Sequence, residues 1–175
     1  LRTFIVYGTE TKETLLDKDL ATRFDFDFYF GVVVNRFCSM AIAGYPITIY
    51  GKGEQKKPMI SLEDCCKSIV NAVKTKNDGK FVVYNQVEKP VSIKELADAV
   101  KTSAAKLGLS VEVVHIPNPR IEKEEHEMEV DTTNFRKLLG GYEVNIERGV
   151  LQTLQSLMPY KHILLRYKDR FLEAK

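Results

Sequence analysis

The chain has 175 residues, of which 44% are hydrophobic and 29% charged, with a net charge of +2. This balance is typical of a globular protein and excludes a disordered chain, and no apolar run reaches the length of a membrane-spanning helix. Because the charge is nearly neutral and no basic block interleaves with aromatic residues, nucleic acid is not expected as a partner.

The hydrophobic pattern alternates strands with helices. In chain order it predicts a strand at 1–7, a helix at 31–43, a strand at 47–50, an extended segment at 57–60, a helix at 61–74, a strand at 80–85, a helix at 92–107, a strand at 111–116, a short helix at 131–141, and a helix or helix pair at 146–170 broken near Pro159. Gly44 and Gly108 follow two of the helices, as C-terminal stop signals do. The alternation predicts an α/β fold in a single domain over 1–175.

The first predicted strand has no upstream strand to pair with. The chain opens at Leu1, already within the pattern of this strand. We therefore expect the chain to be a fragment of a longer protein.

No self-contained catalytic or metal site is evident. His115 falls in a predicted strand and His162 in a predicted helix, and both are interpreted as structural. His126 lies in the acidic run 122–127, which is compatible with a metal ligand or with a solvated face, but the His-Glu-x-x-His pair is absent. The three Cys, two of them adjacent, lack the spacing of a zinc site, and we expect reduced thiols in a cytoplasmic protein.

Three basic residues, Arg36, Lys57 and Arg120, are candidates for binding a diphosphate, since cationic donors match its charge. Arg120 follows a loop that two prolines stiffen. Arg36 is equally compatible with a helix arginine whose stem covers apolar surface, and Lys57 with an ordinary surface lysine. Tyr50, at the end of a strand before a glycine turn, is a candidate for recognising a sugar or a base.

The aromatic run at 24–30 is compatible with a loop that folds back over the core or with a binding segment. Within it, Arg23-Phe-Asp-Phe-Asp27 is a distinctive motif, as are Asn35-Arg-Phe-Cys38, the stretch 44–53, and Pro117-Asn-Pro-Arg-Ile-Glu122. With these motifs in this order, nearly the whole chain resembles the C-terminal, substrate-binding part of extended short-chain dehydrogenases/reductases, the NAD-dependent epimerase/dehydratase family. Within that family it is similar to the UDP-sulfoquinovose synthases and their archaeal homologues.

The resemblance implies a role for particular residues. Arg120 would bind the diphosphate, backbone groups at 48–50 would line the uracil, and Val6 would contact the NAD cofactor. The residues implied in substrate binding are Thr3, Val33, Val34, Asn35, Arg36, Thr48, Ile49, Tyr50, Lys57, Arg120, Ile121 and Glu122. Family members carry Gln in place of Thr3 and Arg in place of Lys57, and these departures leave the sugar and the sulfite step open.

The resemblance also implies a reaction for the parent protein. Bound NAD oxidises the sugar of UDP-glucose, water leaves, sulfite adds, and the hydride returns. The catalytic and NAD-binding residues would lie in a dinucleotide-binding half upstream of Leu1, so we expect this chain to be inactive alone, the full-length protein to be a homodimer, and no membrane or metal to be involved. Two alternatives stay open: a 4-epimerase or dehydratase without sulfite chemistry, and a non-catalytic module that binds nucleotide sugars.

Overall fold

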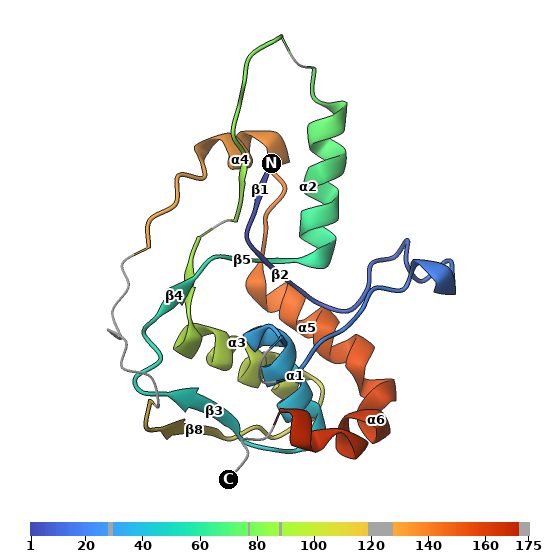
Figure 1. Ribbon diagram of the computed structural model, residues 1–175, viewed down its shortest axis with the longest axis vertical. Coiled ribbons are helices and arrows are strands. Elements are labelled where there is room, and N and C mark those ends of the chain that lie inside the picture. Colours follow the sequence, from blue (N-terminus) through green and yellow to red (C-terminus); the bar gives the residue numbers. More distant parts are fainter. Residues whose placement is uncertain (28–29, 77, 88, 119–127, 172–175) are drawn as a thin grey trace.

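The computed structural model describes residues 1–27, 30–76, 78–87, 89–118 and 128–171. The strands are β1 (Arg2–Thr3), β2 (Ile5–Tyr7), β3 (Ile47–Tyr50), β4 (Lys56–Lys57), β5 (Met59–Ser61), β6 (Asn85–Gln86), β7 (Val91–Ser92) and β8 (Val113–Ile116). The helices are α1 (Val33–Ala43), α2 (Leu62–Lys74), α3 (Ile93–Lys106), α4 (Thr133–Leu139), α5 (Ile146–Leu157) and α6 (Lys161–Arg166). The α/β class is confirmed (Figure 1).

The strands form four two-stranded ladders. β1 and β2 are successive parts of one extended segment and pair in parallel with β6 and β5 respectively. β3 pairs in parallel with β8, and β4 pairs antiparallel with β7. The prediction of a strand at 80–85 is wrong for most of its length, since only Asn85 lies in a strand and Phe81 is 94% exposed. No described strand pairs with 81–84, so the apolar run there lacks the ladder and the cover that a buried strand needs.

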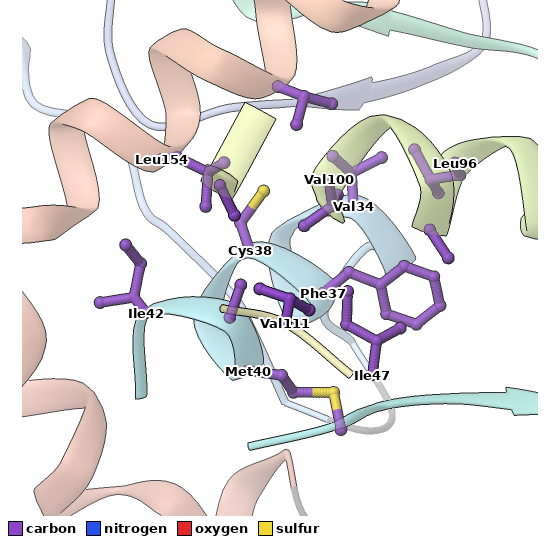
Figure 2. Packing of buried hydrophobic residues seen from close by; sticks show 14 of the residues in the cluster. Val34, Phe37, Cys38, Met40, Ile42, Ile47, Leu96, Val100, Val111 and Leu154 are labelled. Atoms are coloured by element: carbon purple, nitrogen blue, oxygen red, sulfur yellow. The ribbon is translucent and has the colours of Figure 1, made fainter. Parts of the chain in front are cut away.

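The main core surrounds α1, which contacts α3, α5 and α6. Figure 2 shows Phe37 of α1 beside Ile47 of β3, with Val34 close to Val100 of α3. Helix α1 is buried on nearly all sides, and its buried residues include the polar Asn35 and Ser39 besides its apolar side chains.

The predicted helix boundaries are confirmed where capping residues set them. Ser92 and Glu95 form the reciprocal bonds of a capping box at the start of α3. Gly44 ends α1 with φ of 80°, a conformation that glycine adopts without steric cost. The break predicted near Pro159 is a 3₁₀ turn, Met158–Tyr160, between α5 and α6.

A smaller apolar cluster lies at the other end of the molecule. It consists of Ile60, Cys65, Phe135, Leu139 and Val144 and packs α4 against α2 and β5. No helix in the described residues is long and apolar enough to cross a membrane, and these residues contain no group of three metal-ligating side chains.

Candidate functional site

Asn35, in the first turn of α1, joins two of the segments that carry the sequence motifs. Its Oδ1 accepts a hydrogen bond from the backbone N–H of Gly8 at 3.0 Å, and its Nδ2 donates to the carbonyl of Asp25 at 3.3 Å. The side chain is buried, with 4% of the residue exposed. Asn35 therefore holds the aromatic run against the end of β2, so its amide is used within the protein.

Replacing Asn35 with Ala is expected to lower the free energy of unfolding by about 2 kcal/mol, because two backbone groups lose their partner in a buried place. Chemical denaturation measures this loss. Asn71→Ala is the matched control, since Asn71 makes one bond, to the carbonyl of Leu138, from a less buried position. Equal losses in the two variants would contradict the linking role of Asn35.

The N-terminus of α1 has no side-chain cap. Val32 at the cap position makes no side-chain bond to the helix, and the first turn contains no acidic residue. The helices α2, α3 and α5 differ, since Ser61, Ser92 and Asn145 accept a bond from their first turns. Uncapped N–H groups at a helix N-terminus favour an anion.

The predicted residues of this turn differ in what they offer a ligand. Val34 is fully buried in the core, so only its backbone is available. Val33 and Arg36 are half-buried, and the Arg36 guanidinium lies 5.8 Å from the centre of the Phe37 ring. The packing of Arg36 against an aromatic ring agrees with the interpretation that its stem covers apolar surface.

The ends of β3 and β8 meet at a second predicted segment. Tyr50 pairs with Ile116, and the N–H of Gly51 donates to the carbonyl of Ile116 at 2.9 Å. The Nδ1 of His115 lies 2.7 Å from the carbonyl oxygen of Gly51, a contact within the protein. Arg120, Ile121 and Glu122 follow β8 in the sequence and lie outside the described residues, as does His126.

The side chains of β3 alternate between two environments. Ile47 and Ile49 are buried in the core, whereas Thr48 and Tyr50 are half-buried on the other face. Because the N–H groups of Ile47 and Gly51 point toward β8, the backbone groups of Thr48 and Tyr50 face the opposite edge. In the described part of the chain, no strand pairs along that edge.

The remaining predicted residues lie elsewhere. Lys57 is exposed on β4, where it pairs with Val91 of β7. The Thr3 hydroxyl donates to the side chain of Gln86, which is fully buried. Val6 packs half-buried against the smaller apolar cluster. The Thr3 hydroxyl is thus engaged within the protein, and Lys57 presents its ammonium group to solvent.

A pocket of about 490 Å³ was not predicted from the sequence, and none of the predicted site residues lines it. Its wall includes Tyr7, Glu63 and Gln152, and Gln152 donates to the Glu63 carboxylate at 2.7 Å. These three residues come from β2, α2 and α5. Only the fold brings them together, and no sequence motif joins them.

A buried polar network beside this pocket was also missed. The Asp64 carboxylate accepts bonds from Arg148 at 2.8 Å, from the Tyr142 hydroxyl at 2.7 Å, and from the Ser61 hydroxyl at 2.8 Å. Burial and the bond to Asp64 raise the pKa of Tyr142 to about 12, so the phenol stays protonated and continues to donate near neutral pH. The helix predicted at 61–74 includes Asp64, but the sequence gave no signal of its partners Tyr142, which precedes α5, and Arg148, which lies on α5.

Comparison with known proteins gives two curated relatives. The chain is 40% identical over 168 residues to UDP-sulfoquinovose synthase of Sulfolobus acidocaldarius, an alignment that covers 95% of this chain and 42% of the relative. It is 39% identical over 167 residues to the chloroplastic UDP-sulfoquinovose synthase of Spinacia oleracea, covering 95% of this chain and 33% of the relative. The chain therefore spans less than half the length of the curated relatives that it matches. No family model matches the chain.

Solved structures share the fold at low sequence identity. UDP-glucose 4-epimerase of Thermotoga maritima, solved with UDP-glucose, matches 93% of this chain with a TM-score of 0.63 and 20% identity, over 45% of its own length. UDP-glucuronic acid 4-epimerase of Bacillus cereus, solved with UDP-glucuronic acid and NAD, matches 91% of this chain with a TM-score of 0.59 and 19% identity, over 44% of its length. The resemblance predicted from the sequence motifs is thus confirmed: the chain is similar to UDP-sulfoquinovose synthase over nearly its whole length and shares its fold with NAD-dependent sugar-nucleotide epimerases and dehydratases.

Proposed function

We propose that this chain is the UDP-sugar-binding part of an NAD-dependent enzyme of the UDP-sulfoquinovose synthase type, which converts UDP-glucose and sulfite. The observation that carries the proposal is the 40% identity to the Sulfolobus enzyme across 95% of this chain. An alignment of 168 of the 175 residues includes the segments at 33–36 and 48–50, whose geometry suits a nucleoside diphosphate.

The start of α1 supports the diphosphate role. Its first turn has no side-chain cap and contains no acidic residue of its own, which favours an anion such as a phosphate at this helix N-terminus. Arg36 adds a cationic group in the same turn. The role of Asn35 in this proposal is indirect, since it fixes the turn through Gly8 and Asp25.

The edge of β3 that faces away from β8 supports the uracil role, since no described strand pairs along it. The backbone groups of Thr48 and Tyr50 face this edge, and a base that offers N–H and C=O groups pairs with such an edge as an added strand does. The side chain of Ile49 points into the core and its N–H and C=O point toward β8, so the hydrogen bonds to the base are expected from Thr48 and Tyr50. The base is thus expected to be read through main-chain hydrogen bonds.

Arg120 is proposed, from the sequence and the resemblance, to bind the diphosphate, with Ile121 and Glu122 near the ribose. Arg120→Ala is expected to weaken UDP-glucose binding by about 1.5–3 kcal/mol, the range for a charge-assisted hydrogen bond. Calorimetric titration of the full-length protein measures it. Arg136→Ala, an exposed arginine on α4, is the control and should leave the affinity unchanged. An Arg120→Ala affinity equal to that of the wild type overturns the assignment.

The described residues do not themselves form an NAD phosphate cradle. Such a cradle is a glycine-rich turn between a strand and a helix with its N–H groups turned to the ligand. The N–H of Gly8, after β2, donates instead to Asn35, and β2 is followed by a long segment rather than by a helix. We therefore propose that NAD is bound mainly by a dinucleotide-binding half in the part of the relatives that this chain does not span, with Val6 as a contact from this side.

The two alternatives are separated by the product that the full-length protein forms from UDP-glucose, NAD and sulfite. A sulfite-dependent product, identified by mass, supports the synthase. A product of unchanged mass, or one lacking water, in the absence of any sulfite-dependent product favours a 4-epimerase or a dehydratase. Binding of UDP-glucose without formation of any product favours the non-catalytic module that binds nucleotide sugars.

A further inference from the structure

Two pockets adjoin beside α5. The pocket of about 490 Å³ described above, here called the polar pocket, meets a second one of about 280 Å³, here called the apolar pocket. The segment that follows β2 runs beside α5 at this place (Figure 1). The four residues that line both pockets are Thr9, Glu10, Ser156 and Tyr160. A single ligand can therefore extend from one pocket into the other.

The hydroxyl groups on this wall have already used their hydrogens. Thr153 donates to the carbonyl of Gly149 at 2.8 Å, and Ser156 donates to the carbonyl of Thr153 at 3.0 Å. Because the Ser156 hydrogen is used in that bond, Thr9 is the donor in the bond between the Thr9 and Ser156 hydroxyls. These three side chains therefore offer a ligand only lone pairs, which accept hydrogen bonds.

Two carboxylates add to these acceptors. Glu63 accepts a bond from Gln152 at 2.7 Å, whereas no hydrogen bond or ion pair joins the Glu10 carboxylate to any residue that the structure describes. Glu10 is half-buried where the two pockets meet. Lys12 is the one cation among the described residues of the polar pocket, and it is exposed. Because a carboxylate that is partly removed from water gains from a charged partner, a cationic ligand is favoured at Glu10.

The apolar pocket provides room for an uncharged part of the same ligand. Its wall includes Phe24 and Phe26, which stack with their ring centres 5.8 Å apart, and the buried Leu164. Tyr160, which both pockets share, is 51% exposed. An aromatic ring in the same wall as a carboxylate suits an organic ammonium ion, because the face of the ring attracts a cation.

We propose that the joined pockets bind a small organic ammonium ion, with its nitrogen at Glu10 and its apolar group in the apolar pocket. The two carboxylates disfavour an anion. A sugar, whose hydroxyl groups accept as well as donate, is disfavoured by the committed hydrogens of Thr9, Thr153 and Ser156. None of the residues proposed for UDP binding lines either pocket, so this inference goes beyond the proposed function and each can fail without the other.

Titration of phenethylammonium into this chain near neutral pH, with phenethyl alcohol as the matched neutral probe, tests the proposal. The ammonium ion should bind at least about tenfold more tightly than the alcohol and should shift the NMR signals of the Thr9, Glu10 and Tyr160 amides. Equal affinities for the two probes, or no binding of the ammonium ion, would overturn the proposal. Tighter binding of methyl glucoside at the same amides would assign the pockets to a sugar and overturn it as well.

A charge-neutralising variant tests the role of Glu10. Glu10→Gln should lower the affinity for phenethylammonium at least about tenfold, to that of phenethyl alcohol, and leave the affinity for the alcohol unchanged. Glu112→Gln is the matched control, since it removes the same charge at an exposed residue outside both pockets, and it should change neither affinity. Equal losses in the two variants would show that only the overall charge of the chain attracts the ammonium ion, which contradicts a site at Glu10.

Discussion

Arg148→Ala is expected to lower the free energy of unfolding by about 3 kcal/mol, because it leaves a buried carboxylate without its cationic partner. The Asp64 side chain is only 2% exposed, and Arg148 lies 2.8 Å from it. The same terminal nitrogen of Arg148 also donates to the Tyr142 hydroxyl at 2.7 Å and to the carbonyl of Glu143 at 3.0 Å. The substitution therefore removes the Arg148 bonds that link α5 to Asp64 of α2 and to the segment before α5.

Lys106→Ala provides the control for this loss. Lys106 pairs with Glu147 at 3.8 Å, and both side chains are more than half exposed. Exposed pairs contribute little, so the control should change the free energy of unfolding by less than about 1 kcal/mol. Urea denaturation of both variants gives the comparison. If Arg148→Ala costs no more than Lys106→Ala, the buried network does not stabilise the fold as described.

Gly149→Ala is expected to destabilise the protein by about 2 kcal/mol, opposite in sign to the usual effect of this substitution within a helix. A Cβ at position 149 would lie 2.3 Å from the Tyr7 hydroxyl oxygen and 2.9 Å from the Cβ of Ser61. Tyr7 is 2% exposed and packs in the core, so its ring has little room to move. The glycine on α5 thus makes space for the last residue of β2.

Tyr7→Phe provides a test of the cause, since it removes the hydroxyl that an alanine at 149 would meet. The double variant Tyr7→Phe, Gly149→Ala should lose less stability than the sum of the two single variants, by about 1 kcal/mol or more. The ring carbon at 3.1 Å and Ser61 remain, so the rescue should be partial. Thermal or urea unfolding of the wild type, the two single variants and the double variant completes this double-mutant cycle. Strict additivity would show that the Tyr7 hydroxyl is not what limits the space at Gly149.

The elements that the sequence predicted well are those whose boundaries local chemistry determines. Ser92 with Glu95 and the glycine at 44 set helix ends through bonds within a few residues, so their patterns are readable directly. The failure at 80–85 has the opposite cause. An apolar run such as Phe81 to Val83 becomes a strand only with a neighbouring strand, and the sequence of this chain does not reveal whether one is present.

The predictions for the candidate site succeeded and failed for the same two reasons. Motifs located the start of α1 and the end of β3, because helix and strand termini carry recognisable residues. The use of Asn35 as a link between Gly8 and Asp25, and of Thr3 as a donor to Gln86, depends on contacts 10 to 83 residues apart in the chain. The pocket beside Tyr7 and the network of Asp64 depend on α5, which follows them by more than 80 residues. Such partners follow from topology, which periodicity alone does not specify.

Titration of UDP into this chain, with ADP as the matched control, tests the central claim most directly. If α1 holds the diphosphate and the edge of β3 reads the base, UDP should bind measurably and at least about tenfold more tightly than ADP, a difference of about 1.4 kcal/mol. Equal affinities for the two nucleotides, or no binding of UDP at concentrations where the chain is folded, would contradict the assignment of the UDP site to these residues.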